Sequence, residues 1–136
     1  MTTTELLNIL NENKDISFTK ILEKIPDITL IDYLEMLLET HHTTKAQIIK
    51  TSTLDRTYAY QIFNGKKNPS QNKIVMLALA FQLDLHDTNV LLTLSKNQNL
   101  YAKIKRDALI IFAINHQYDV LKTNELLDEY GFELLN

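Results

Sequence analysis

The chain has 136 residues, of which 45% are hydrophobic, two are glycine, two are proline and none is cysteine. Its length suits one domain, or one domain with an extension, and so few turn-forming residues predict an all-α fold. The absence of cysteine excludes disulfide frameworks and cysteine-ligated zinc sites. The most apolar run, residues 74–83, has about half the length of a membrane span.

The net charge of −3 is distributed unevenly. Residues 1–42 carry three basic and eight acidic residues, a balance of −5, and residues 74–136 carry five and eight, a balance of −3. Residues 43–73 carry six basic residues against Asp55 alone, a balance of +5. This segment is therefore the candidate for contact with nucleic acid. The alternative is a chance cluster of solvated lysines.

The first 28 residues are expected to form an N-terminal helical extension. Short helices are predicted over residues 4–12 and 17–25, ending at Pro26. Their leucine and isoleucine pairs can either cap the core or mediate dimerisation, and we favour the core role. The main domain is predicted to span residues 29–96 and to begin with a helix that ends near residue 41.

Two short helices joined by a three-residue turn are predicted within the basic segment. Thr44 and Gln47 form a capping box, so the first helix is expected over residues 45–52. Asp55 is a good N-cap for a second helix over residues 56–64. This spacing is typical of a helix-turn-helix.

The second of these helices is predicted to have one buried and one polar side. At about 100° per residue, Tyr58, Ala59, Ile62 and Phe63 share the side that faces the core. The opposite side groups side chains that can read base edges, because Arg bonds guanine, Gln bonds adenine and the Thr methyl contacts thymine. These polar residues are Arg56, Thr57, Tyr60, Gln61 and Asn64. Gly65 supplies the left-handed residue that ends the helix.

The helices "TTKAQII" and "LDRTYAYQIFNG", the loop "KKNPS" and the apolar helix "KIVMLALAFQL" together resemble the lambda-repressor-like (Xre/Cro) helix-turn-helix family. The resemblance covers residues 31–96. It implies a five-helix DNA-binding domain that acts as a homodimer on double-stranded DNA, with helix 56–64 in the major groove. It implies DNA contacts from Thr44, Lys45, Arg56, Thr57, Tyr60, Gln61, Asn64, Lys66 and Lys67.

Three residues depart from the family pattern. Thr53 stands where the turn usually has glycine, Ile49 where alanine is common, and Ser52 where leucine is frequent. If the turn requires a left-handed conformation, Thr53 costs about 1 kcal/mol. The polar side of helix 56–64 is unaffected.

The remaining helices complete the domain and add an extension. Ser70 is expected to cap a helix over 71–82, and Asp84 a helix over 85–95. Residues 97–136 are predicted to form a C-terminal helical extension that begins with a polar connector. Its first helix is predicted over about 105–117. Its second helix is predicted to begin after the N-cap Asp119, to run to Tyr130 and to be closed by Gly131. The stretch "ALIIFAI" is apolar on every side, so its own domain or a second subunit must enclose it.

No catalytic pattern is present. The chain lacks a glycine-rich phosphate loop, a nucleophile elbow and a metal signature, so no enzyme activity, cofactor or metal is expected. His86 and His116 have no partner at ligand spacing, and the adjacent His41 and His42 point about 100° apart on a helix.

The predicted function is a sequence-specific DNA-binding transcriptional regulator of repressor type. It is expected in the cytoplasm and not at a membrane, because polar residues follow Met1. Whether a protein or peptide effector acts through the C-terminal helices is left open. The alternative is a helical protein-interaction adaptor that has kept the fold but does not bind DNA, favoured by the acidic flanks and the apolar helix over 105–117.

Overall fold

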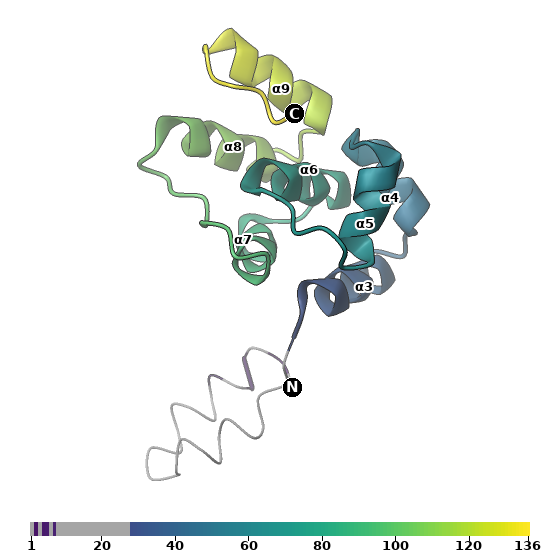
Figure 1. Cartoon of the computed structure of the whole chain (residues 1–136). Coiled ribbons are helices and arrows are strands. Elements are labelled where there is room, and N and C mark those ends of the chain that lie inside the picture. The colour runs from purple at the N-terminus through teal and green to yellow at the C-terminus, as the bar shows by residue number, and fades with distance from the viewer. Residues whose placement is uncertain (1, 3, 6, 8–27) are drawn as a thin grey trace.

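The computed structural model describes residues 2, 4, 5, 7 and 28–136, and residues 28–136 contain seven helices and no strand (Figure 1). The all-α prediction is therefore confirmed for this range. The helices predicted over 4–12 and 17–25 lie almost wholly outside the described residues. None of the helices in the described part of the chain has the length and hydrophobicity of a membrane span. The seven helices are α3 (Leu30–Thr40), α4 (Lys45–Ser52), α5 (Arg56–Phe63), α6 (Gln71–Phe81), α7 (Leu85–Leu94), α8 (Lys105–Asn115) and α9 (Val120–Glu129).

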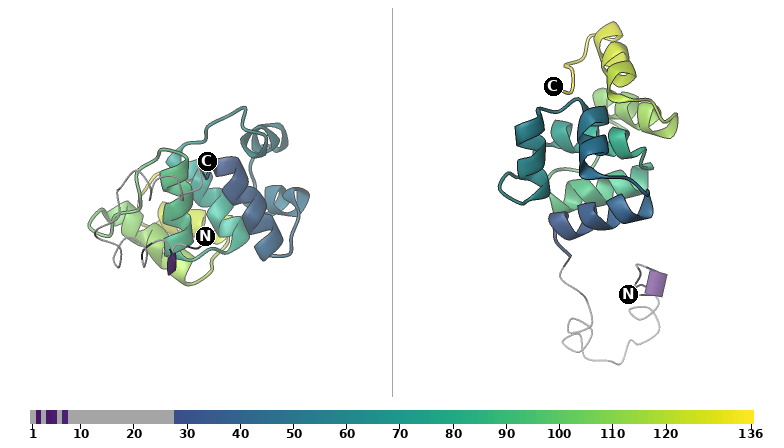
Figure 2. Two further views of the ribbon diagram at one scale, coloured as in Figure 1. Left: turned by 90° about the horizontal axis from the view of Figure 1, so that it is seen from below. Right: turned by 90° about the vertical axis from the view of Figure 1, so that its right-hand side faces the viewer.

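Helix α6 lies at the centre of the bundle. The α4–α5 pair packs on one side of it, and α7 and α9 also contact it. Figures 1 and 2 place α3 and α7 at one end of the bundle and α9 at the other. Because neighbours surround α6, seven of its eleven residues are buried, namely Ile74, Val75, Met76, Leu77, Ala78, Leu79 and Phe81.

The predicted N-caps explain where most of the helices begin. The side chains of Thr44, Asp55, Asp84 and Asp119 each accept a hydrogen bond from a backbone N–H in the first turn. Each bond satisfies a donor that has no partner within the helix. Ser70 differs from these four, because it precedes α6 with extended backbone but its hydroxyl forms no capping bond.

The two C-terminal helices pack on the same core as the preceding helices. Ile110 of α8 and Leu127 of α9 belong to the same cluster of buried residues as α6. The Arg106 guanidinium donates to the backbone oxygen of Glu133 at 3.0 Å and to the Asn72 side chain at 3.1 Å. Arg106 therefore ties the C-terminal segment to the start of α6. Helix α8 ends at Asn115 rather than at 117, since Gln117 has a positive φ of 55°.

The connector between α7 and α8 is fastened by asparagine side chains. The Asn97 amide donates to the backbone oxygen of Pro69 and to the Ser95 hydroxyl, both at 2.9 Å. The Asn89 side chain accepts from the backbone N–H of Leu100 at 3.0 Å. The polar residues of the connector thus hold α7 against the loop that precedes α6.

A half-buried phenol, Tyr33, joins α3 to α7. Partial burial, the charge of the Asp87 carboxylate with its hydrogen bond to the phenol, and the charge of Asp84 together raise the pKa of Tyr33 to about 12. The raised pKa means that the Tyr33 phenol stays protonated, and able to donate to Asp87, to a higher pH than an exposed tyrosine. This contact holds α3 over the end of the bundle.

Substitution of Gly65 by alanine should destabilise the protein more than the same substitution at Gly131. Both glycines have positive φ, 83° and 77°, so an added Cβ costs about 1 kcal/mol at each. At Gly65 the Cβ would also lie 2.6 Å from Cδ1 of Ile31, whereas at Gly131 nothing lies within 4 Å. We expect Gly65→Ala to lower the free energy of unfolding by about 1–2 kcal/mol, measured by urea denaturation. Equal losses in the two variants would show that Ile31 yields without cost.

Candidate nucleic-acid interface

Helices α4 and α5 are joined by a turn that the hydroxyl of Ser52 organises. This hydroxyl is buried, donates to the backbone oxygen of Ile49 at 2.7 Å and accepts from the backbone N–H of Leu54 at 3.2 Å. Thr53 follows with φ 61° and ψ 9°, the left-handed conformation that usually favours glycine. The turn therefore tolerates a strained threonine, and the serine satisfies backbone groups that a leucine would leave without this partner.

The buried side of α5 fixes the direction of its polar side. Ala59, Ile62 and Phe63 are fully buried against the core, as predicted. Tyr58 is half-buried and packs at the edge of the core. The face that remains outside the core contains Arg56, Thr57 and Asn64, which are exposed, and Tyr60 and Gln61, which are half-buried.

The Tyr60 ring lies between α4 and α5 and contacts the Arg56 side chain. The ring packs against the core and lines, with Ile49 and Leu54, a hollow of about 400 Å³ between α4 and α5. The guanidinium carbon of Arg56 lies 5.8 Å from the centre of this ring, within the range of a cation–π contact. The structure thus brings Arg56 and Tyr60 together and orients the guanidinium at the start of α5.

Lys45 is engaged by a residue that the sequence analysis did not single out. Its ammonium nitrogen lies 2.9 Å from a carboxylate oxygen of Glu35 in α3, and the two side chains are 40% and 49% exposed. The two residues are separated by the loop between α3 and α4, so helical spacing could not pair them. An exposed ion pair contributes only about 0–1 kcal/mol, and a phosphate can therefore replace Glu35 at little cost.

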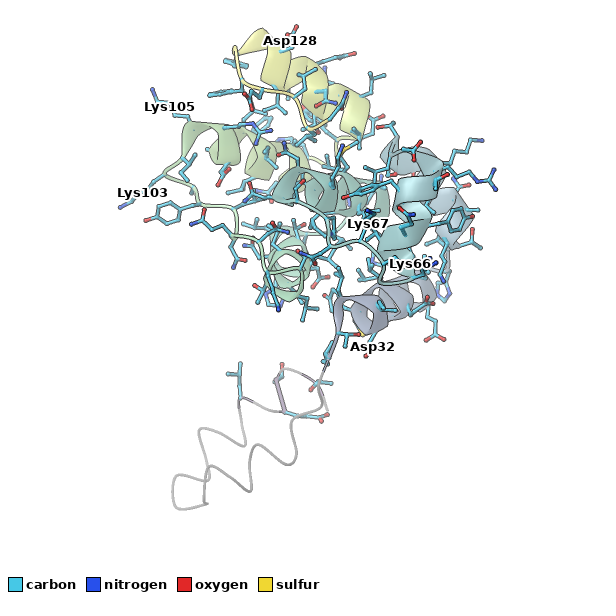
Figure 3. All side chains as sticks on the ribbon, viewed as in Figure 1. Asp32, Lys66, Lys67, Lys103, Lys105 and Asp128 are labelled. Atoms are coloured by element: carbon cyan, nitrogen blue, oxygen red, sulfur yellow. The ribbon has the colours of Figure 1, made fainter. Side chains whose placement is uncertain are left out.

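The loop after α5 presents two further cations. Lys66 and Lys67 are exposed beside α5, and both backbone N–H groups donate to the backbone oxygen of Gln61, at 2.9 and 3.1 Å (Figure 3). The Asn64 side chain accepts from the backbone N–H of Lys66 at 3.1 Å. This bond gives Asn64 a structural part in the loop that its sequence position did not reveal.

Thr44 lies at the start of α4, on the side of the two-helix unit where Lys45 also lies. Its hydroxyl accepts from the backbone N–H of Gln47 at 3.2 Å, and the residue is exposed. A hydroxyl can accept and donate at once, so the capping bond leaves its proton able to bond an acceptor outside the chain.

Metal binding offers no competing site in the described part of the chain. Among the described residues, no group of three or more His, Asp or Glu side chains is placed to hold a metal ion. Comparisons with family models, with characterised proteins and with solved structures find no match to this chain. Function is therefore inferred from the geometry and charge of the α4–α5 surface.

Replacing Thr53 with glycine should stabilise the protein. Glycine adopts the left-handed conformation without steric cost, and relief of the β-branched side chain is expected to add up to about 1 kcal/mol to the free energy of unfolding. Thr53→Ala, which keeps a Cβ, should gain less. Chemical denaturation of the three proteins measures the difference, and a loss of stability in Thr53→Gly would contradict the strain inferred at this turn.

Proposed function

We propose that this protein is a sequence-specific DNA-binding transcriptional regulator in which α3 to α7 form a lambda-repressor-like helix-turn-helix domain. One observation carries the proposal. The segment with a charge of +5 coincides with a helix, α5, whose apolar side is buried and whose polar side remains outside the core. A helix presented in this way fits the major groove of DNA.

In the proposed complex, the first turn of α5 reads the bases. Recognition helices contact base edges chiefly through their N-terminal residues, which here are Arg56 and Thr57. The Arg56 guanidinium has the geometry to bond the two major-groove acceptors of guanine, and its contact with the Tyr60 ring restricts its orientation. Gln61, one turn further along, is suited to adenine.

Residues around α5 would bind the phosphates and set the position of the helix. Thr44 and Lys45 lie at the N-terminus of α4, where backbone N–H groups and the helix dipole favour an anion. Asn64, Lys66 and Lys67 follow the C-terminus of α5, at the end of the helix away from Arg56. Such contacts carry affinity and orientation rather than sequence information.

We further propose that the protein binds two half-sites as a dimer and represses transcription by occupying its site. The rival function is a protein-interaction adaptor, which the acidic balance of residues 1–42 and 74–136 favours. The two functions differ in one measurable property. A regulator selects a consensus sequence from a random pool of DNA, whereas an adaptor retains no DNA even at low salt and binds one protein in a fixed ratio.

Arg56→Ala and Lys66→Ala should weaken DNA binding in different ways. With the selected consensus as probe, Arg56→Ala should cost about 1–3 kcal/mol and relax the preference at one base position, because a base contact is lost. Lys66→Ala should weaken all sequences alike and reduce the salt slope by about 0.9, because one phosphate contact is lost. Titrations at several salt concentrations measure both effects. If neither variant changed binding, the proposed docking would be wrong.

Glu35→Gln should strengthen binding to DNA of any sequence. The substitution releases Lys45 from its ion pair and removes a negative charge beside the proposed phosphate contact. We expect a gain of about 0.5 kcal/mol, near twofold in affinity at low salt. Glu39→Gln provides the control, because Glu39 lies on the same helix and forms no ion pair within the described residues. Equal gains in the two variants would show that only net charge matters and that Lys45 lies away from the phosphates.

A further inference from the structure

An open apolar groove lies between α8 and α9, away from the helices that form the proposed DNA surface. It has a volume of about 450 Å³ and is lined by Ala108, Leu109, Phe112, Leu126, Tyr130 and Phe132, with Lys105 at its edge. Phe112 and Tyr130 are 48% and 65% exposed. Large aromatic side chains gathered at one exposed place indicate an interaction surface.

The groove marks where the core leaves the apolar stretch of α8 incompletely enclosed. Ile110, Ala113 and Ile114 are buried against the rest of the protein. Phe112, on the other side of the same helix, is half exposed; its ring stacks on the exposed His116 ring at 4.0 Å between centroids and meets the edge of the Tyr118 ring at 6.1 Å. This apolar stretch is expected to be enclosed by its own domain or by a second subunit. Within the described residues, the protein's own core encloses only the inner side of the stretch.

The two walls of the groove carry opposite charges at the same end. Helix α9 runs back over α8, so the start of α8 lies near the end of α9 (Figure 1). Lys105 is the first residue of α8, Lys103 lies in the segment just before it, and Asp128 lies near the end of α9 (Figure 3). Glu129 is not part of the lining, but it follows Leu126 by three residues on α9 and so lies beside the groove. Within the described residues, neither Lys105 nor Glu129 forms an ion pair.

A surface with this charge pattern is complementary to itself. A two-fold axis that runs along the groove exchanges its two walls, so that α8 of one copy faces α9 of the other. Lys105 of each copy then meets Glu129 of the other, and the helices that face each other are antiparallel, which pairs their dipoles favourably. Both ion pairs form at once because the contact is symmetric.

We propose that this protein forms a homodimer through the α8–α9 groove, with the Phe112 ring of each copy inserted between α8 and α9 of the other. The dimer does not depend on DNA binding, and it concerns helices other than α4 and α5. A small ligand fits the groove less well. The groove is open, and a small ligand needs polar groups that fix its orientation. Among the described residues, every buried side-chain nitrogen or oxygen already has a hydrogen-bond partner, so none is free to orient a ligand.

The first test is the mass of the full chain in solution, without DNA, by sedimentation velocity over a wide range of concentrations. The unchanged protein should be dimeric, and Phe112→Asp should raise the dimer dissociation constant about 30-fold or more, as for a central aromatic residue of an interface. Leu121→Asp is the matched control, because Leu121 is 66% exposed on α9 but does not line the groove. A monomeric unchanged protein, or a Phe112→Asp variant that stays dimeric, would overturn the proposal. Circular dichroism of each variant shows that it is folded.

The second test uses charge exchange and is specific to a second copy as the partner. Lys105→Glu and Glu129→Lys should each be mostly monomeric, because each symmetric dimer would contain two pairs of like charges. An equimolar mixture of the two variants should form dimers again, since every charge then faces its opposite. Recovery of dimer in the mixture supports this geometry. A mixture that stays monomeric, or single variants that both remain dimeric, would show that the two walls do not face each other across a two-fold axis.

Discussion

Burial of α6 on all sides is the constraint on which the other helices depend. A helix whose residues from Ile74 to Leu79 are all removed from water must be surrounded, and α4, α7 and α9 contribute to its cover. Each of these helices turns its apolar side inward, so the direction of every outward face is decided at the same time. The position of α5, which packs through α4, follows from this arrangement.

The proposed DNA surface is a consequence of that packing. Ala59, Ile62 and Phe63 hold α5 in one rotation about its axis, and Arg56 and Thr57 must then face outward. The short turn after α4 sets the angle between the two helices, at the expense of a left-handed threonine. The left-handed Thr53 places backbone strain next to the proposed DNA surface. Backbone strain of this kind is often found at functional sites.

The α8–α9 groove follows from the limits of the same core. The core that encloses α6 covers only the inner side of α8, and the outer side of α8, which includes Phe112, stays in contact with water. The proposed DNA surface and the proposed dimer surface use different helices. A dimer built on α8 and α9 therefore leaves the polar face of α5 exposed in both copies.

The sequence by itself determined the helices and their starts. N-caps such as Asp55 and Asp119, the left-handed glycines and helical periodicity are local properties, and the structure agrees with them to within two residues over 28–136. The buried side of α5 was also predictable, because its spacing is visible along one helix. Only the tertiary structure decided that Glu35 holds Lys45, that Tyr60 lines a hollow beside α4, and that Phe112 lines an open groove. These contacts join residues whose distance in space depends on how the helices pack, and packing is set by the whole core rather than by any local pattern.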